Sequence, residues 1–246
     1  MKKKGISLLL ALLFLFSLAA CGQEEGQESS ETQSGGETTE AEETTGTEET
    51  TEVGETTETG EEAGAATDGN ILIAYFSWAD NAVSGEEVDA QASPSVTEPG
   101  HVAQLATWVQ EETGGDLFSI RVQEPYPTDW SECLDRGNQE KTDDVHPELA
   151  ETLDNIDEYD VVFLGYPNWW YSCPMALFSF FDQHDLAGKQ VYLFCSHGTG
   201  GLAESVEDIS EALPDSQISD QVFDVYEEDA PSAQEDIRDW LDSLGY

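Results

Sequence analysis

The stretch Ile71-Leu72-Ile73-Ala74-Tyr75-Phe76 decides the fold class of this chain. Six apolar or aromatic residues in a row, with no polar alternation, are typical of a strand that is covered on both faces of a parallel sheet. Two further runs of this kind occupy residues 161–165 and 191–195. The sequence therefore predicts a buried parallel sheet with helices on both faces.

Helical patterns lie between these strands. Apolar residues recur at helical spacing from Val102 to Val109, and Gly114-Gly115 ends that pattern. Similar spacing predicts helices over residues 174–181 and 202–213, and a final helix that starts near Pro231. Strands that alternate with helices in this way indicate an α/β domain.

The remaining elements are less regular. Residues 117–122 mix apolar and polar positions, which favours an edge strand, and a last strand is expected within 218–226. The sequence Asp129-Trp130-Ser131 predicts another helix start, and residues 147–153 are interpreted as a second short helix.

The N-terminus has the composition of an export signal. Lysines at positions 2–4 precede the apolar stretch 6–20, which is too short to span a bilayer. The stretch ends in Leu18-Ala19-Ala20-Cys21-Gly22, which resembles the lipobox of bacterial lipoproteins, where the cysteine becomes the lipidated N-terminus. We therefore expect residues 1–20 to be a signal peptide and the lipid on Cys21 to hold the protein at the outer face of a bacterial membrane. An ordinary signal peptide with an incidental cysteine is the alternative.

A polar segment separates this cysteine from the first strand. Residues 22–68 consist almost entirely of Glu, Thr, Gly, Ser, Gln and Ala. Such a segment cannot bury enough apolar surface to offset its ordering entropy. Residues 21–69 are therefore expected to be a lipidated cysteine followed by a disordered linker, and residues 70–246 to form one folded domain.

The formal net charge of −45 is shared between linker and domain. The linker holds 16 of the 53 acidic residues, and residues 69–246 hold 37 acidic residues against five basic ones. So acidic a domain is not expected to bind nucleic acid or anionic lipid directly, and a basic or neutral partner is favoured.

Three cysteines remain once Cys21 carries lipid. Cys133, Cys173 and Cys195 show no metal-ligand spacing, so no metal site is predicted. Cys195 ends an apolar strand and is interpreted as a core residue. A disulfide bridge between Cys133 and Cys173 is kept as an alternative to free thiols.

The loops that follow the strands carry the candidate site, because ligands of open parallel sheets bind beyond the carboxyl ends of the strands. After the third strand come three aromatic residues, 169–171, whose rings suit the stacking of a flat heterocycle; packing at a core edge or a subunit contact is the alternative. After the fourth strand, the small residues within 196–201 let the backbone approach a ligand closely. The first strand leads through Ser77 to a helix start at residues 100–103, where free N–H groups and a hydroxyl suit a phosphate.

Two enzyme classes fit less well. Residues 198–203 match the dinucleotide-binding pattern G-x-G-x-x-A, but that fingerprint belongs after the first strand of its unit and here follows the fourth. The G-x-S-x-G elbow of serine hydrolases does not occur in the sequence.

Five segments, in this order, resemble the flavodoxin family, in particular its branch of exported bacterial lipoproteins. They are residues 71–77, residues 116–118, Tyr126-Pro127 with Glu132-Cys133, residues 165–170 and residues 196–201. The resemblance implies a three-layer α/β/α sandwich with a five-stranded parallel sheet in the order 2-1-3-4-5. It also implies FMN as cofactor, and a role in electron transfer or in reduction of a small acceptor such as a quinone.

The resemblance assigns a part of FMN to each of three loops. The phosphate would lie at Ser77, Gly100, His101, Val102 and Ala103. One side of the flavin ring would lie at Pro167, Asn168, Trp169, Trp170 and Tyr171, and its pyrimidine edge at Ser196, His197, Gly198, Thr199, Gly200 and Gly201. No catalytic side chain is expected: His197 is the only acid or base near the ring, and a structural hydrogen bond is its more ordinary role.

The chain departs from the family at the phosphate loop. Relatives usually read Gly-Asn-Thr where this chain has Gly100-His101-Val102, so the threonine hydroxyl is absent. His101 is a replacement donor, more effective below neutral pH, and the hydroxyls of Ser93, Ser95 or Thr97 are others. The departure motivates an alternative, namely a surface binding module that kept the fold and lost FMN.

Overall fold

The computed structural model describes residues 70–90 and 93–246. The predicted signal peptide (1–20), the predicted lipidation site Cys21 and the predicted linker (21–69) lie outside these residues. Within the described residues, no helix is long and apolar enough to cross a membrane.

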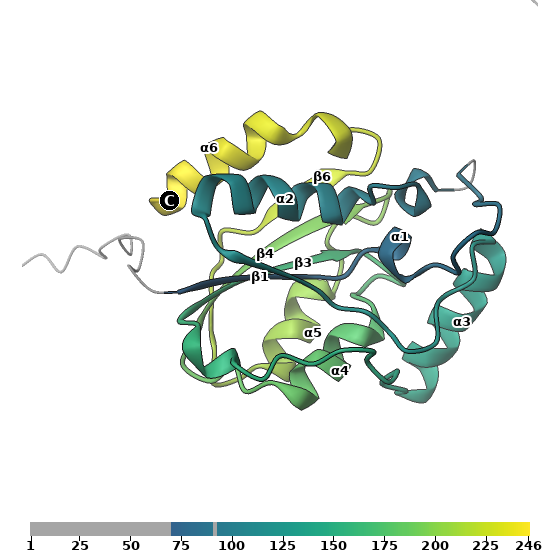
Figure 1. Cartoon of the computed structure of the whole chain (residues 1–246), viewed down its shortest axis with the longest axis horizontal. Coiled ribbons are helices and arrows are strands. Elements are labelled where there is room, and N and C mark those ends of the chain that lie inside the picture. Colours follow the sequence, from purple (N-terminus) through teal and green to yellow (C-terminus); the bar gives the residue numbers. More distant parts are fainter. Residues whose placement is uncertain (1–69, 91–92) are drawn as a thin grey trace, which may run out of the picture. The chain divides into compact units, whose positions relative to one another are not determined.

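Parallel strands form the central sheet, as the apolar runs predicted (Figure 1). β1 (Ile71–Tyr75), β3 (Val161–Pro167) and β4 (Gln190–His197) lie side by side, and β2 (Asp116–Ser119) pairs with the free side of β1. The order β2-β1-β3-β4-β5 is the expected one, and β2 is the expected edge strand. Because every pair is parallel, the carboxyl ends of the strands meet at one edge of the sheet.

The fifth position of the sheet is filled by two short segments rather than by one strand. β5 (Gln217–Ile218) pairs with the start of β4, and β6 (Phe223–Tyr226) pairs with its end. The residues between β5 and β6 outnumber those they oppose on β4, so the ladder is interrupted as at a bulge. After the interruption, β6 brings Tyr226 opposite His197 at the carboxyl edge.

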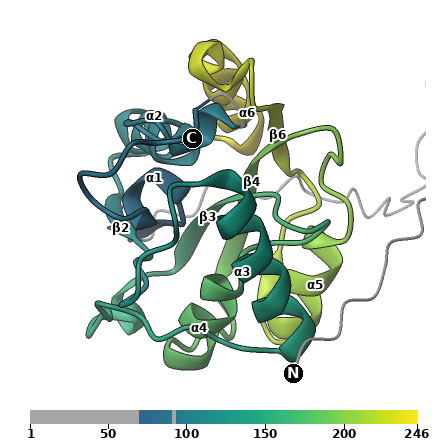
Figure 2. The ribbon, with the colours of Figure 1, turned by 90° about the vertical axis from the view of Figure 1, so that its right-hand side faces the viewer.

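Helices cover both faces of the sheet and give it three layers (Figure 2). α2 (His101–Thr113) and α6 (Gln234–Leu244) lie on one face. On the other face lie α4 (Met175–Gln183) and α5 (Ser205–Ala212), and α3 (Trp130–Asp143) stands beyond the carboxyl ends of the strands, next to α4 (Figure 1). The predicted three-layer α/β/α sandwich is confirmed.

Successive residues of β1 serve two separate cores, as the pleat of a doubly covered strand requires. Leu72 faces the core under α4, where Phe180 is also fully buried, and Ile73 faces the core under α2 and α6. Full burial of each such side chain contributes about 1.5–3 kcal/mol. The apolar run therefore fixes β1 at the centre of the domain.

The short helix expected at residues 147–153 is wrong. Leu149 forms an isolated antiparallel bridge with Val122, and the backbone bonds of its neighbours go to residues 121–123, with Ala150 N–H donating to Arg121 O (2.8 Å). Seven residues with few apolar positions cannot stabilise a helix alone. A neighbouring chain segment supplies the backbone partners instead.

The loop after β1 contains two short helices that the sequence did not indicate, α1 (Trp78–Asn81) and η1 (Pro94–Val96). The buried amide of Asn81 holds this loop against the segment that follows β2: it donates to Ile120 O (3.0 Å) and accepts from Val122 N–H (2.8 Å). Two further 3₁₀ helices, η2 (Ile156–Glu158) and η3 (Ala230–Ser232), complete the described elements, and η3 holds the Pro231 expected at the last helix start.

Candidate functional site

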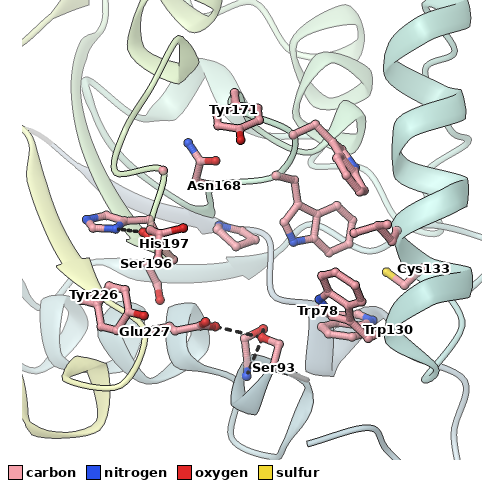
Figure 3. A pocket seen from close by; sticks show the side chains of 18 residues that line it. Trp78, Ser93, Trp130, Cys133, Asn168, Tyr171, Ser196, His197, Tyr226 and Glu227 are labelled. Atoms are coloured by element: carbon pink, nitrogen blue, oxygen red, sulfur yellow. Dashed lines mark hydrogen bonds between the residues drawn. The ribbon is translucent and has the colours of Figure 1, made fainter. Parts of the chain in front are cut away.

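A cavity of about 380 Å³ opens at the carboxyl edge of the sheet (Figure 3). Its volume falls in the range of roughly 300–1,000 Å³ that small-molecule sites occupy. Ten of the sixteen predicted binding residues line it: Pro167, Asn168, Trp169, Trp170, Tyr171, Ser196, His197, Gly198, Thr199 and Gly200. Two predicted loops, those after β3 and β4, are thereby brought together around one cavity.

The loop after β3 turns sharply at its aromatic tip. Trp169 and Ser172 exchange both backbone bonds (3.0 and 2.9 Å), and the two residues between them, Trp170 and Tyr171, have φ angles of 57° and 60°. Left-handed backbone costs an ordinary residue about 1–2 kcal/mol. Such strain at a bulky residue is a mark of functional sites, and here it presents two rings at the mouth of the cavity.

The three aromatic residues of this loop have different surroundings. Trp169 packs edge-on against Phe76 and Tyr126, with ring centroids 5.3 and 5.1 Å away. It therefore packs at the edge of the core, which was the alternative interpretation of these aromatic residues. Tyr171 is 68% exposed. The backbone oxygen of Trp170 accepts a bond from Lys141 Nζ (3.1 Å), which ties the loop to α3. Of these three rings, Trp169 is the one committed to the core, and Tyr171 is the most exposed.

Asn168 joins the loops after β3 and β4. Its backbone N–H donates to Ser196 O (2.9 Å), and its side-chain amide donates to Leu202 O (2.9 Å). The glycines that follow β4 allow a close approach: Gly201 has φ of 61° and its N–H bonds Gly198 O (3.2 Å). Gly201 itself does not line the cavity.

His197 is held by hydrogen bonds at both ring nitrogens. Nδ1 lies 2.8 Å from Gly198 O, and Nε2 lies 2.9 Å from a carboxylate oxygen of Asp224 on β6. Both partners are acceptors, so each lies where a protonated ring nitrogen can donate to it. This structural role is the one that sequence reasoning favoured for His197.

The predicted phosphate residues, Ser77 and residues 100–103, do not line the cavity. Instead they form a buried group at the start of α2. Ser77 and His101 are 1% and 5% exposed, and Ser77 Oγ and His101 Nδ1 have no hydrogen-bond partner among the described residues. A Cβ on Gly100 would collide with Ser77 Oγ. The first-turn N–H groups of a helix also lack intrahelical acceptors, so these residues fit a phosphate.

Sequence reasoning missed a second wall of the cavity. Trp78 lies on α1, while Trp130, Cys133 and Leu134 lie on α3 (Figure 3). The predicted helix start at 129–131 was the only signal for that wall: Asp129 caps α3 by accepting from Glu132 N–H (2.9 Å). No local pattern indicates that α3 reaches this edge of the sheet.

The remaining lining residues are Ser93, Ser95, Tyr226 and Glu227. The serines do fold back onto the cavity, as expected from the long first loop. Ser93 Oγ, however, donates to a carboxylate oxygen of Glu227 (2.9 Å) and lies 2.8 Å from Ser95 Oγ. The Ser93 hydroxyl is thus already engaged with an acid that no sequence pattern places here, and the Ser95 hydroxyl is engaged with Ser93.

The ionisable groups near the cavity do not form a nucleophilic or metal centre. Burial raises the pKa of the Cys133 thiol from 9.0 to about 12. Cys133, Cys173 and Cys195 are free thiols, so the bridge left open between the first two is not formed. Among the described residues, no cluster of histidine, cysteine or carboxylate side chains could hold a metal.

The fold and the cavity together define a doubly wound α/β protein with a cavity of small-molecule size at the carboxyl edge of its sheet. Residues 93–244 match the family model for flavodoxins, and the chain belongs to the flavodoxin family.

Solved structures are similar to the chain as well. A protein from Bacteroides eggerthii described as a flavoprotein is similar over 73% of this chain and 99% of its own, with 27% identity and a TM-score of 0.56. A second such protein, from Bacteroides uniformis, has 22% identity over 72% and 99% of the two chains, also with a TM-score of 0.56. A flavoprotein from Lactobacillus acidophilus solved in complex with FMN has 17% identity over 68% and 99%, with a TM-score of 0.47. No curated protein matches the chain.

Proposed function

We propose that this protein binds FMN at the carboxyl edge of its sheet and transfers electrons with it. The observation that carries the proposal is the buried group at the start of α2. Among the described residues, Ser77 Oγ has no hydrogen-bond partner, Gly100 leaves room for this hydroxyl, and the helix start supplies N–H groups. The cavity has a volume suitable for a small molecule. Unpaired buried donors are costly, and a phosphate would satisfy them.

The chain's own residues would bind and orient the cofactor. Ser77 and the amides of residues 101–103 would hold the phosphate, Trp170 and Tyr171 would contact the flavin ring, and the backbone of residues 198–200 would face its pyrimidine edge. FMN, when bound, accepts and releases the electrons. No side chain of the cavity is assigned an acid–base role, because His197 is committed at both nitrogens.

We infer that electrons pass to or from a redox partner protein or a small acceptor such as a quinone. The folded part carries 37 acidic and five basic residues, which favours a basic or neutral partner and disfavours nucleic acid. The alternative, a binding module without FMN, is favoured by one observation: Glu227 places a carboxylate on the cavity wall, and carboxylates repel phosphate.

We also propose that the protein is a lipoprotein held outside the cytoplasm by lipid on Cys21. The proposal rests on Leu18-Ala19-Ala20-Cys21-Gly22 and on the polar segment 22–68, which would let the domain stand away from the membrane. The membrane contact would then be the lipid alone.

A flavin absorption spectrum of the full chain, purified in mild detergent and supplied with FMN, tests the cofactor. We expect flavin bands that stay with the protein through gel filtration. Trp170→Ala should weaken FMN binding by tenfold or more, whereas Trp240→Ala, which removes a half-buried tryptophan of α6 outside the cavity, should not. A colourless protein that takes up no FMN would support the binding module instead.

Membrane fractionation tests the lipid. The chain expressed in a bacterial host should appear in the membrane fraction and incorporate labelled fatty acid, and Cys21→Ser should do neither. Cys133→Ser, which changes a buried cysteine of the folded part, is the matched control and should keep the label. Labelling that survives Cys21→Ser would contradict the proposal.

A further inference from the structure

Glu227 is fixed in the cavity wall next to the predicted phosphate end. Its carboxylate accepts a bond from Ser93 Oγ on the loop before η1 (2.9 Å), and its backbone N–H donates to His197 O (2.8 Å) (Figure 3). Its other carboxylate oxygen would lie 3.6 Å from a Cβ on Gly198. Two elements therefore hold this acid in place, and it is not a freely moving surface side chain.

His101 is the titratable group among the predicted phosphate residues. It is the first residue of α2, it is 5% exposed, and its Nδ1 has no hydrogen-bond partner among the described residues. Burial lowers the pKa of His101, and the charge of Glu227 opposes that shift. A buried imidazole with an unpartnered nitrogen, in the field of a carboxylate, is therefore able to take up a proton when more negative charge arrives.

The other charged groups near α2 do not affect the pKa of His101 in this way. Asp80 on α1 accepts a hydrogen bond from Ser119 Oγ (2.7 Å), and its charge contributes to the raised pKa of Tyr75. Glu98 precedes α2, and Glu228 and Asp229 precede η3. Among the described residues, Glu227 is the charged group whose field raises the pKa of His101 against the effect of burial.

The basic residues of the folded part are committed elsewhere. None of the five lines the cavity. Four donate to partners away from the start of α2: Arg136 to Glu140, Lys141 to Trp170 O, Lys189 to Tyr159 O and Arg238 to Glu112. The fifth, Arg121, is exposed, and its charge acts to lower the pKa of Tyr75. A phosphate at the start of α2 would meet a carboxylate and no permanent cation.

We propose, on the basis of the proposed FMN site, that binding of the FMN phosphate is coupled to uptake of one proton from solvent by the His101–Glu227 pair. The phosphate carries a charge of about −1.5 to −2 near pH 7. With His101 protonated, Nδ1 becomes a donor to the phosphate and its positive charge offsets that of Glu227. Riboflavin, which has the same ring and no phosphate, would bind without this proton.

The ratio of FMN affinity to riboflavin affinity measures this coupling, because it cancels contacts to the ring. Titration calorimetry of the full chain between about pH 8.5 and 6.5 should give a ratio that rises toward tenfold per pH unit as pH falls. His101→Asn should make the ratio independent of pH. Glu227→Gln, which keeps an acceptor for Ser93, should raise the ratio at about pH 8 by tenfold or more.

Glu228→Gln is the matched control, because it removes the same charge from the exposed neighbouring position. It should change the ratio less than twofold. Titration of the His101 ring proton by NMR gives a readout that needs no flavin: Glu227→Gln should lower the apparent pKa of His101, and Glu228→Gln should not.

The outcomes separate the coupling from the function on which it rests. A ratio that does not vary with pH, or a Glu227→Gln variant that behaves like Glu228→Gln, overturns the coupling while FMN binding stands. Riboflavin binding with no FMN binding at any pH also overturns it, since the phosphate is then never admitted. If neither flavin binds, the proposed function fails and the coupling with it.

Discussion

Trp170 of the loop after β3 lies in the space that Gly137 leaves on α3. A Cβ on Gly137 would lie 2.5 Å from the indole Nε1 of Trp170. Glycine usually weakens a helix interior by about 1 kcal/mol relative to alanine. Its presence in the middle of α3 is therefore explained by the close approach of the indole, and α3 sets the position of one wall of the cavity.

Gly137→Ala should displace this indole and lower FMN affinity by roughly tenfold. Overpacking costs about 1–3 kcal/mol, which the better helix propensity of alanine partly offsets, so the unfolding free energy should fall by no more than about 2 kcal/mol. FMN titration and urea unfolding measure the two effects. Asn138→Ala, at the next and exposed position, gains helix propensity without touching Trp170 and should keep full affinity. Equal affinity in both variants would refute the assigned role of Gly137.

Short apolar runs made the sheet predictable, because residues such as Leu72 and Ile73 must both be buried and only a doubly covered strand allows it. The same argument placed residues 167–171 and 196–200 at one edge, since parallel strands end together. Prediction of strands from apolar runs was weakest where the strand is only partly buried. The interrupted fifth strand, with β5 and β6 as separate segments, follows from a ladder register that no local pattern specifies.

The phosphate end illustrates the other limit. Ser77, His101 and Glu227 come from different parts of the chain, and only the first two belong to the segment between β1 and α2 that the sequence singles out. Glu227 lies in an acidic run that reads as ordinary surface. Its position follows from the pairing of Tyr226 opposite His197, a tertiary contact without a sequence signal.

Tyr126→Phe should destabilise the domain by about 1–3 kcal/mol. The fully buried hydroxyl donates to Glu140 (2.7 Å), whose other oxygen accepts from Arg136 Nε (2.8 Å), and the guanidinium of Arg136 lies 4.0 Å from the Tyr126 ring centre. Removing the hydroxyl leaves a buried carboxylate with one donor fewer.

Urea unfolding measures this loss, and Tyr159→Phe is its control. Tyr159 also donates to a carboxylate, that of Asp116 (3.0 Å), but this acceptor is exposed and water can replace the donor. The control should lose less than about 1 kcal/mol. Equal losses in the two variants would mean that burial of the network around Tyr126 has no energetic effect.

Alkaline pH should destabilise the domain through its buried thiols. Burial raises the pKa of Cys133 and Cys173 from 9.0 to about 12 in the folded state. The folded state then holds protons that the unfolded chain releases, so the stabilisation is complete below about pH 9 and is lost as pH rises toward 12. Each thiol should lower the unfolding free energy by about 1.4 kcal/mol per pH unit in that window.

Unfolding of Cys133→Ala at several pH values isolates one of these contributions. The variant should show a slope about 1.4 kcal/mol per pH unit shallower than the parent. Leu134→Ala, which removes a neighbouring apolar side chain of the same wall and no titrating group, should keep the parent slope. A parent slope in the Cys133→Ala variant would indicate that this thiol titrates alike in both states.

The midpoint potential of bound FMN should lie below that of free FMN. Reduction to the anionic hydroquinone adds negative charge to a domain with 37 acidic and five basic residues, and the cavity wall carries Glu227 but no lysine or arginine. The summed electrostatic field of these acidic residues disfavours the reduced form.

Salt separates this field from local contacts to the ring, because the Debye length falls from about 30 Å at 0.01 M to about 10 Å at 0.1 M. Spectroelectrochemical titration at both salt concentrations should therefore show a negative shift that shrinks with salt, measured against free FMN in the same buffers. A positive shift would contradict the argument outright, and a negative shift that salt leaves unchanged would assign the effect to the loops after β3 and β4 rather than to the acidic surface.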